Sequence, residues 1–250
     1  MVYSLSPISL RFTVQSKTSF IQRNFSRNIA PGKVSATIGF FRPSTGSSLE
    51  EERCRVGVKI GLNSKELAVP SQVHSNIVKI IDRPGYVDKC DGLITNKNDI
   101  VLSVQIADCV PIFIYSPDVR ALGLIHAGRK GTANEISVYA VKKLMDELGA
   151  TPEEMFIFLG PSIQPCCYTV QDDVAYQFQP EFYTPNSTGF ALDLIKANIV
   201  QLVSMGVPED QIRKTDICSC CNGTMFHSYR RDGHKAGRNF CFLKLNQGKI

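Results

Sequence analysis

Three residues of zinc-binding types each stand beside a strand-like apolar run of this sequence. They are His74, Cys109 and His126, and the two histidines are half of the four in the chain. Two imidazoles and a thiolate suit zinc, and three protein ligands leave a fourth tetrahedral position open, as in catalytic zinc sites. Pro111 is expected to interrupt its strand and to let the Cys109 thiol point out of the sheet. The residue types therefore predict a zinc centre.

The same three residues are also compatible with roles that need no metal. A buried cysteine and two hydrogen-bonded histidines occur in many protein cores without a bound ion. Cys109 is also a possible nucleophile with His126 as its base. Residue type and spacing leave these alternatives open.

The other polar groups carry weaker signals. Cys218-Ser-Cys-Cys together with His227 offers enough ligands for a second zinc, but the spacing fits no familiar finger, and reduced structural cysteines account for it as well. The adjacent Cys166 and Cys167 are interpreted as packing residues. Arg230 and its neighbour, beside a tyrosine, are either a solvated pair or a phosphate or ribose contact.

Composition excludes several classes of protein. The 250 residues are 43% hydrophobic and 20% charged, and the net charge of +5 comes from scattered basic residues, so no nucleic-acid partner is expected. No apolar run is long enough to span a membrane. The nine cysteines include adjacent pairs and are expected to be reduced. These features are typical of a cytoplasmic protein that binds small anionic ligands.

The N-terminal segment allows a second localisation. The first 49 residues hold six Lys or Arg and no Asp or Glu, a composition typical of an organellar transit peptide. Residues 1–9 are therefore either disordered or part of a targeting segment. Residues 10–14 and 36–40 favour the other interpretation, since they look like strands of the domain.

The elements that must position the zinc ligands can be predicted from periodicity and caps. Ser48 and Glu51 form a capping box that starts a helix over residues 49–60, with Arg53 in its second turn. A second helix is expected over 132–148, ending at Gly149, and a third from Asp193 to Gly206. Strands are expected over 77–81, 92–95, 101–107, 111–115, 121–125, 155–159 and 239–245. This order favours a single α+β domain of mixed α/β layers, with mixed β-sheets flanked by helices.

Six motifs in register resemble those of one family. They are Val69-Pro-Ser-Gln-Val-His-Ser, Cys90-Asp-Gly-Leu-Ile-Thr, Ala107-Asp-Cys-Val-Pro, His126-Ala-Gly-Arg-Lys-Gly, Leu159-Gly-Pro-Ser-Ile-Gln-Pro-Cys-Cys-Tyr and Ser228-Tyr-Arg-Arg. The chain is identified by them as similar to the YfiH-type family, also called the multicopper polyphenol oxidase or laccase domain family. The resemblance runs from about residue 50 to 245 and implies a YfiH-like single domain.

The resemblance also implies chemistry. It implies a zinc held by His74, Cys109 and His126, a functional arginine at Arg53, and phosphorolysis of adenosine, inosine and methylthioadenosine with adenosine deamination. Arg230 is the candidate substrate contact. The family's usual His-Ala-Gly-Trp-Arg-Gly is here His-Ala-Gly-Arg-Lys-Gly, which puts the substrate preference in doubt. The expected partners are purine nucleosides and phosphate, and the oligomeric state is open.

Three rival functions remain compatible with the sequence. A copper-dependent polyphenol oxidase would need roughly ten histidines, and the chain has four. A hydrolase with a Cys109 nucleophile and a zinc-stabilised interaction module are the others. Deamination further needs a carboxylate to move protons. Asp108 is next to a ligand, but strand alternation is expected to turn it to the opposite face.

Overall fold

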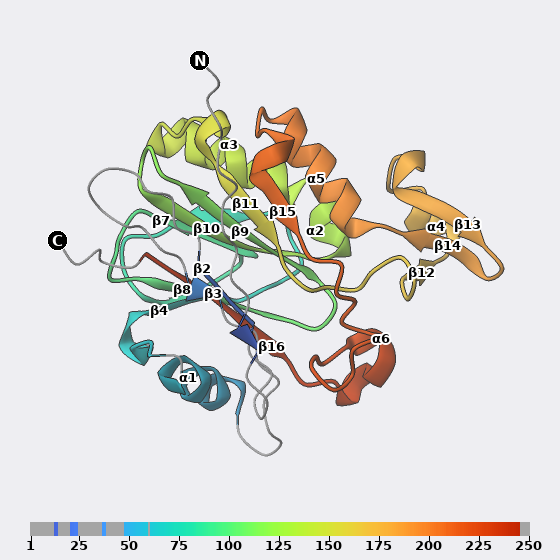
Figure 1. The fold of residues 1–250 in the computed structure, drawn as a ribbon, viewed down its shortest axis with the longest axis horizontal. Helices are drawn as coiled ribbons and strands as arrows, with labels where there is room; N and C mark the ends of the chain where they lie inside the picture. Colours follow the sequence, from blue (N-terminus) through green and yellow to red (C-terminus); the bar gives the residue numbers. More distant parts are fainter. Residues whose placement is uncertain (1–12, 15–20, 25–36, 39–47, 60, 246–250) are drawn as a thin grey trace.

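The chain folds into stacked layers of helix and sheet, seen edge-on in Figure 1. This computed structural model describes residues 13–14, 21–24, 37–38, 48–59 and 61–245. Two sheets lie face to face in the middle, a pair of longer helices covers the outer face of one, and a single helix covers the outer face of the other. The fold is therefore α+β with mixed layers, as the sequence predicts.

The larger of the two stacked sheets has six strands, and His126 lies near the end of one of them. Its order is β15 (Ile212–Lys214), β11 (Phe156–Leu159), β9 (Val110–Ser116), β10 (Ala121–Ala127), β7 (Gly92–Thr95) and β5 (Val78–Ile80). The outer pairs β11–β15 and β5–β7 are parallel, whereas the inner pairs are antiparallel. Both faces are covered, so β9 and β10 are buried along their whole length, which explains why they read as continuous apolar runs.

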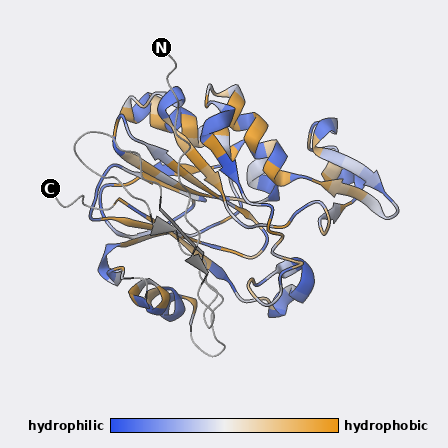
Figure 2. Cartoon of the chain, in the orientation of Figure 1, coloured by the Kyte–Doolittle hydropathy of each residue, from blue (hydrophilic) through white to orange (hydrophobic). Residues whose placement is uncertain are grey.

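The second sheet packs against the first and closes the core. Its order is β16 (Asn239–Lys244), β8 (Val101–Ile106), β4 (Leu67–Pro70) and β6 (Gly85–Val87). Side chains from both inner faces, such as Leu102 and Leu124, form one apolar cluster between the sheets. Figure 2 shows this inner region as mainly hydrophobic ribbon. Burial of these faces is the main force that holds the two sheets together.

Helices cover the outer faces. The six-stranded sheet is covered by α3 (Ile136–Leu148) and α5 (Leu194–Ser204), and the short α2 (Arg129–Ala133) leads into α3 from the end of β10. The four-stranded sheet is covered by α1 (Leu49–Lys59), whose Val56 packs with Phe240 and Phe242. Hydrophilic and hydrophobic stripes along these helices are visible in Figure 2.

Smaller elements extend from one end of the layers. The strands β12 (Thr169–Val170), β14 (Gly189–Leu192) and β13 (Tyr183–Asn186) form a three-stranded sheet beside α4 (Asp172–Ala175), which projects to the right in Figure 1. Below it lies α6 (Tyr229–Asp232). The strands β1 (Thr13–Val14), β2 (Ile21–Asn24) and β3 (Thr37–Ile38) pair in a further sheet. Short 3-10 turns occupy Ser64–Glu66, Pro152–Glu154, Pro180–Phe182, Glu209–Gln211 and Gly233–Lys235.

Most predicted elements are confirmed within one or two residues. The helix expected over 132–148 is wrong in its first turn, because Glu135 adopts a left-handed conformation with φ of 59° and separates α2 from α3. The predicted strands over 10–14 and 36–40 are confirmed at Thr13–Val14 and Thr37–Ile38, and their other residues lie outside the described part. Residues 1–9, with the targeting interpretation, also lie outside it.

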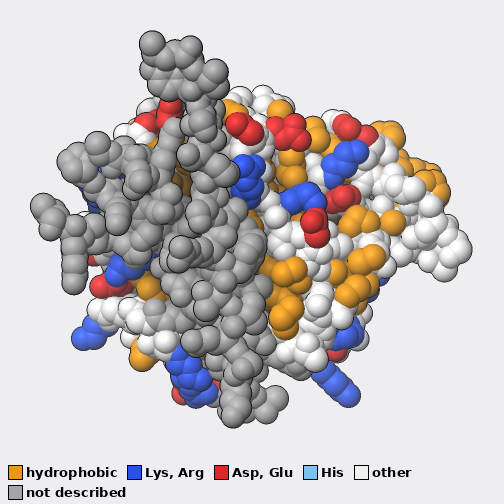
Figure 3. All heavy atoms as spheres, in the orientation of Figure 1, with side chains coloured by type: hydrophobic (Ala, Val, Ile, Leu, Met, Phe, Trp, Pro, Cys, Tyr) orange, Lys and Arg blue, Asp and Glu red, His pale blue; other side chains and the backbone are white. Residues whose placement is uncertain are grey.

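The distribution of surface charge and the lengths of the helices agree with two predictions from composition, scattered basic residues and no membrane-spanning run. On the face drawn in Figure 3, basic and acidic side chains are interspersed over the described residues and do not gather into a stripe of one sign. Within the described ranges, every helix is too short or too polar to cross a bilayer.

Candidate metal centre and substrate cavity

The three predicted zinc ligands come together at one end of the stacked sheets. One ligand atom from each of His74, Cys109 and His126 lies within 4.8 Å of the other two. The imidazole rings of the two histidines meet edge to face with their centres 5.0 Å apart. His126 is buried at the end of β10, Cys109 lies in the turn between β8 and β9, and His74 lies in the loop after β4. Residues separated by up to 52 positions thus form one potential coordination sphere.

The buried carboxylate of Asp91 hydrogen-bonds to the ring of His126 and to the backbone of His74. Its Oδ1 lies 2.9 Å from Nδ1 of His126 and accepts the backbone N–H of His74 at 2.9 Å. Its Oδ2 accepts the backbone N–H and the hydroxyl of Ser75 at 2.6 and 2.7 Å. Because Nδ1 of His126 donates to this carboxylate, Nε2 is left to bind a metal. Burial raises the pKa of Asp91, yet the hydrogen bonds from His126 and Ser75 lower it below its usual value.

The backbone around the ligands is held in a rarely populated conformation. His74 has φ of 59°, Gln72 has φ of 55° and Asp108 has φ of 89°. The Gln72 side chain donates to the carbonyl of Gln105 at 2.7 Å and accepts its N–H at 2.8 Å, which ties the His74 loop to β8. Left-handed φ values at non-glycine residues cost free energy and persist where surrounding contacts enforce them, often at functional sites.

The space beside Gly128 fits a small ion. A Cβ at this position would lie 3.0 Å from both Sγ of Cys109 and Nδ1 of His74, and 3.7 Å from Cε1 of His126. The donor atoms therefore face a hollow that exists because residue 128 has no side chain. A soft sulfur and two imidazole nitrogens around such a hollow are the donor set that zinc prefers.

Cys109 and His126 are electrostatically coupled. Burial raises the pKa of the Cys109 thiol, but the charge of His126 and hydrogen bonds from both histidines lower it to about 6. Burial opposes protonation of His126, yet the Cys109 thiolate and Asp91 raise its pKa to about 9. The two opposite shifts favour a Cys109 thiolate beside a protonated His126 in the metal-free protein. Metal binding would displace that proton.

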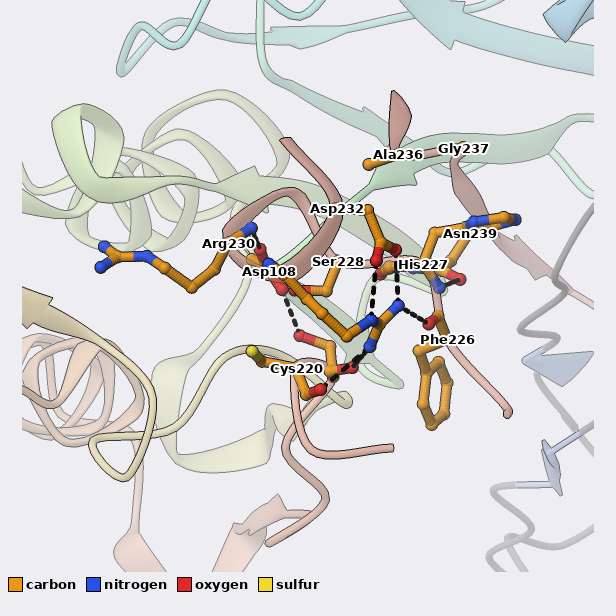
Figure 4. Close-up of polar contacts among 12 residues, drawn as sticks. Asp108, Cys220, Phe226, His227, Ser228, Arg230, Asp232, Ala236, Gly237 and Asn239 are labelled. Carbon is orange, nitrogen blue, oxygen red and sulfur yellow. Dashed lines mark hydrogen bonds and ion pairs between the residues drawn. The ribbon is translucent and has the colours of Figure 1, made fainter. Parts of the chain in front are cut away.

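The ligands open into a cavity of about 880 Å³. Its lining contains four cationic side chains, Arg129, Lys130, Arg230 and Arg238, and two tyrosines, Tyr168 and Tyr229. The guanidinium of Arg230 lies 5.1 Å from the centre of the Tyr168 ring and donates to the Thr169 carbonyl at 2.9 Å. In Figure 4 its side chain extends away from Cys220 and Phe226. A cavity with cations and aromatic faces suits a ligand that has both a ring and an anionic group.

Asp108 corrects two expectations. Residues 107–109 form a turn, so strand alternation does not apply, and Asp108 lines the same cavity as Cys109. Its Oδ1 accepts the hydroxyl of Ser219 at 2.6 Å and its Oδ2 accepts the backbone N–H of Arg230 at 2.7 Å (Figure 4). The left-handed turn at Asp108, and not Pro111, turns the chain here. Pro111 lies inside β9 opposite His126 and accepts a hydrogen bond from Gly160.

Arg53 lies behind the cavity wall. It is 8% exposed, its guanidinium lies 5.3 Å from the centre of the Phe240 ring, and it donates to the side chain of Gln105 at 3.1 Å. Gln105 itself lines the cavity. Among the described residues, the buried Nε of Arg53 has no hydrogen-bond partner. Gln105 therefore lies between Arg53 and the cavity, and Arg53 does not line the cavity itself.

Sequence reasoning missed several of these residues. Asp91 stands in the quoted segment Cys90-Asp-Gly but was assigned no role, although a carboxylate at the start of a strand is a signal. Gly128 follows a predicted ligand by two positions. Tyr168 closes the quoted Cys-Cys-Tyr segment, and only the fold brings it under Arg230. The residues that replace Trp-Arg, Arg129 and Lys130, both line the cavity.

The sequence has relatives with stated activities. Residues 34–246 match the sequence profile of a family described as multi-copper polyphenol oxidoreductase laccase. Purine nucleoside phosphorylase YlmD of Geobacillus stearothermophilus is 37% identical over 161 residues, which cover 61% of this chain and 59% of that protein. Adenosine deaminase RL5, from an unknown prokaryotic organism, is 32% identical over 208 residues, which cover 76% of this chain and 79% of that protein. The match to YlmD thus spans less than two thirds of its length.

The fold is also similar to a solved structure. The crystal structure of YlmD from Geobacillus stearothermophilus superposes with a TM-score of 0.81 at 27% identity, covering 94% of this chain and 99% of that one. The similarity extends over nearly all of both chains, beyond the region in which the sequences align.

Proposed function

Because the chain belongs to the multi-copper polyphenol oxidoreductase laccase family, with relatives named as a purine nucleoside phosphorylase and an adenosine deaminase, we propose that it is a zinc-dependent purine nucleoside phosphorylase. Its substrates in this proposal are adenosine, inosine and methylthioadenosine with phosphate, and adenosine deamination is a second reaction at the same site. The observation that carries the proposal is the placement of a two-histidine, one-cysteine donor set in the wall of a cationic, tyrosine-lined cavity.

Phosphorolysis needs groups that hold phosphate near the sugar. A phosphate oxygen attacks C1′, the bond from C1′ to N9 breaks, and the purine leaves with the bonding electrons. Arg230 is a candidate to bind phosphate or ribose, because Tyr168 and the Thr169 carbonyl fix its guanidinium at the cavity wall. Arg53 is a candidate positioning residue for this reaction: it does not line the cavity itself, but it donates to Gln105, which does.

The donor set lines the same cavity as Arg230. A zinc ion held by His74, Cys109 and His126 would supply a Lewis acid that stabilises negative charge developing on the substrate. Asp91 orients His126 and the His74 loop, so it prepares the donor set before substrate arrives. Tyr168 and Tyr229 offer ring faces to the purine.

Deamination needs a carboxylate that moves protons, and Asp108 is the candidate. Among the described residues that line the cavity, it is the one with a carboxyl group. Ser219 and the Arg230 N–H each donate to one of its oxygens, which fixes the carboxylate beside the metal ligands and leaves lone pairs for a proton. Its role is to carry a proton toward the departing amino group at C6 of adenosine.

Two rival functions are less well supported. Four histidines in the whole sequence are too few for a multi-copper oxidase, whatever the family is called. A hydrolase with Cys109 as nucleophile would use the same thiolate and imidazolium pair. It gives no reason for His74 to approach the same sulfur, whereas a metal site does.

Identification of the products tests the proposal. Zinc-loaded protein is incubated with adenosine with and without phosphate, and the products are identified by mass. Adenine and ribose 1-phosphate that form only with phosphate would support phosphorolysis, and inosine that forms without phosphate would support deamination. Free ribose released at the same rate without phosphate would instead identify a hydrolase.

A further inference from the structure

Four other cysteines converge outside the cavity. Cys166, Cys167, Cys218 and Cys221, the four-cysteine cluster, have sulfur atoms that all lie within 4.8 Å of one another. The sequence suggested His227 as a partner of the second pair and packing for the first pair. The structure brings the two cysteine pairs to each other, and His227 is not part of the group.

The sulfur separations match a metal site better than a disulfide. Sγ of Cys221 lies 3.3 Å from that of Cys167 and 3.7 Å from that of Cys166, and the latter two are 3.9 Å apart. Four thiolates around zinc with Zn–S bonds of about 2.3 Å would be about 3.8 Å apart. A disulfide needs about 2.05 Å. The three separations are thus close to the edge length of such a tetrahedron, and the sulfur of Cys218 lies within 4.8 Å of the other three.

The pairing of two strands brings the two cysteine pairs together. The parallel strands β11 and β15 leave the sheet side by side, and a bridge between Ser162 and Cys218 continues their pairing. The N–H of Ser219 donates to the Ser162 carbonyl at 3.0 Å. The sulfur of Cys218 accepts the backbone N–H groups of Cys220 and Cys221 in its own turn and that of Gln164 on the other loop, so it is fixed between the two loops.

We propose that the four-cysteine cluster binds a second zinc ion, with a structural role. All four tetrahedral positions are taken by sulfur, so no position is open for substrate, unlike at the first site. Such an ion would cross-link the loop after β11 and the loop after β15, which are paired by one isolated β-bridge between Ser162 and Cys218.

The ion also ties together two walls of the cavity. On one loop, Cys167 is followed by Tyr168, which lies under Arg230. On the other, Ser219 donates to Asp108. The side chain of Arg231 donates to the carbonyls of Ser219 and Cys220 at 3.2 and 2.9 Å and fixes this turn against α6 (Figure 4). Loss of the second zinc is therefore expected to loosen the walls while the first site keeps its own ligands.

Metal counting on the full chain tests the proposal. Zinc, iron and copper per chain are measured by mass spectrometry for protein purified under reducing conditions. The wild type should hold two zinc ions, and the Cys218→Ser, Cys221→Ser double variant should hold one. Cys54→Ser is the control, because it changes a cysteine of α1 that belongs to neither site, and it should keep two. Cys109→Ser should keep one, so failure of the first site is distinguishable from failure of this one.

A second measurement tests the proposal without the double variant, in case that variant does not fold. Cys109→Ser protein is loaded with cobalt, whose tetrathiolate complex has strong thiolate charge-transfer absorption. That absorption should appear and should disappear on addition of a thiol-blocking mercurial. Equal zinc content in the wild type and the double variant, absence of the cobalt signal, or an intact mass lower by the hydrogens of a disulfide within the cluster would each overturn the proposal.

Discussion

His126 and Asp91 are joined twice, by their backbones and by their side chains. The ring Nδ1 of His126 lies 2.9 Å from the Asp91 carboxylate, and the His126 N–H donates to the Asp91 carbonyl at 2.8 Å. The same carboxylate accepts the N–H of His74. One buried residue thus sets the position of both imidazoles, although it has no place in the ligand set itself.

Asp91→Asn should weaken zinc binding at the first site. Asparagine keeps the size but replaces one acceptor oxygen by an NH2 donor, so it cannot accept from His126 and His74 through one atom and from the Ser75 N–H through the other. Loss of such a partner typically lowers metal affinity or activity by about 10-fold to 100-fold. Competition with a coloured chelator measures the affinity, and Asp88→Asn, an exposed change three residues earlier, is the control. Equal affinity in both variants would show that Asp91 does not position the ligands.

Gly128→Ala should block the first site without unfolding the chain. The added methyl group would lie 3.0 Å from Sγ of Cys109 and from Nδ1 of His74, in the space between the donors. Zinc at this site should fall below half occupancy and activity should fall with it, while circular dichroism stays native. Gly57→Ala is the matched control, because its methyl would meet neighbours at 3.8 Å or more in a helix, where alanine is favoured. Full zinc occupancy in Gly128→Ala would mean that the ion lies elsewhere.

Asp108→Asn should separate the two proposed reactions. A general acid or base typically contributes about 100-fold to 10,000-fold, so inosine formation should fall by that order. The amide oxygen can still accept the Arg230 N–H and the amide NH2 can donate to the Ser219 hydroxyl, which is able to accept, so the wall should keep its shape. Phosphate-dependent adenine release should fall much less. Ser219→Ala, which removes the donor and keeps the carboxylate, should lower inosine formation by a smaller factor. An unchanged rate of inosine formation in Asp108→Asn would exclude it as the proton carrier.

Arg53→Ala should lower phosphorolysis and leave zinc content intact. Removal of a preorganised charged donor costs about 2 to 4 kcal/mol, or about 30-fold to 1000-fold in rate. Arg53→Lys should recover little, since an ammonium cannot reproduce the planar guanidinium that lies over Phe240 and donates to Gln105. Lys59→Ala, an exposed change on the same helix, is the control and should be neutral. A folded Arg53→Ala protein with wild-type kinetics would remove Arg53 from the mechanism.

Zinc affinity at the first site should rise with pH through the neutral range. The raised pKa of His126, about 9, means that zinc must displace one proton below that pH, while the lowered pKa of Cys109, about 6, means that the thiol is already ionised above it. Affinity should therefore increase about tenfold per pH unit between these values and level off above the higher one. Calorimetry in buffers of different ionisation enthalpy, as the difference between wild type and Cys109→Ser, should give one released proton per zinc. A pH-independent affinity would contradict the coupled pair.

The sequence predicted the first ligand set better than its surroundings. His74, Cys109 and His126 could be selected because their side chains have a known ligand chemistry and their motifs resemble those of a family with a zinc site, and the structure brings the three together. Asp91 could not be assigned a role, since its partners lie 17 and 35 positions away and meet it only when β7 and β10 pair. For the same reason, no local pattern indicated that the Cys166–Cys167 pair and the Cys218–Cys221 pair belong to one cluster. Their meeting depends on the parallel pairing of β11 and β15, for which no local pattern exists.

Two further errors in the predicted secondary structure come from local backbone conformation. The helix break at Glu135 and the turn at Asp108 both need a left-handed φ at a residue that is not glycine. Propensity disfavours that conformation, and tertiary contacts impose it. Helix caps and apolar runs, which act within a few residues, were predictable, and so were most element boundaries.

In the proposed function, His74, Cys109 and His126 form the centre that catalyses phosphate-dependent release of purine. The decisive measurement is the rate of adenine release from adenosine in phosphate by wild type, Cys109→Ser and, as a control outside both cysteine sites, Cys54→Ser. Wild type and Cys54→Ser should release adenine together with an equal amount of ribose 1-phosphate, and Cys109→Ser should release neither. Undiminished phosphorolysis by a folded Cys109→Ser protein would contradict it.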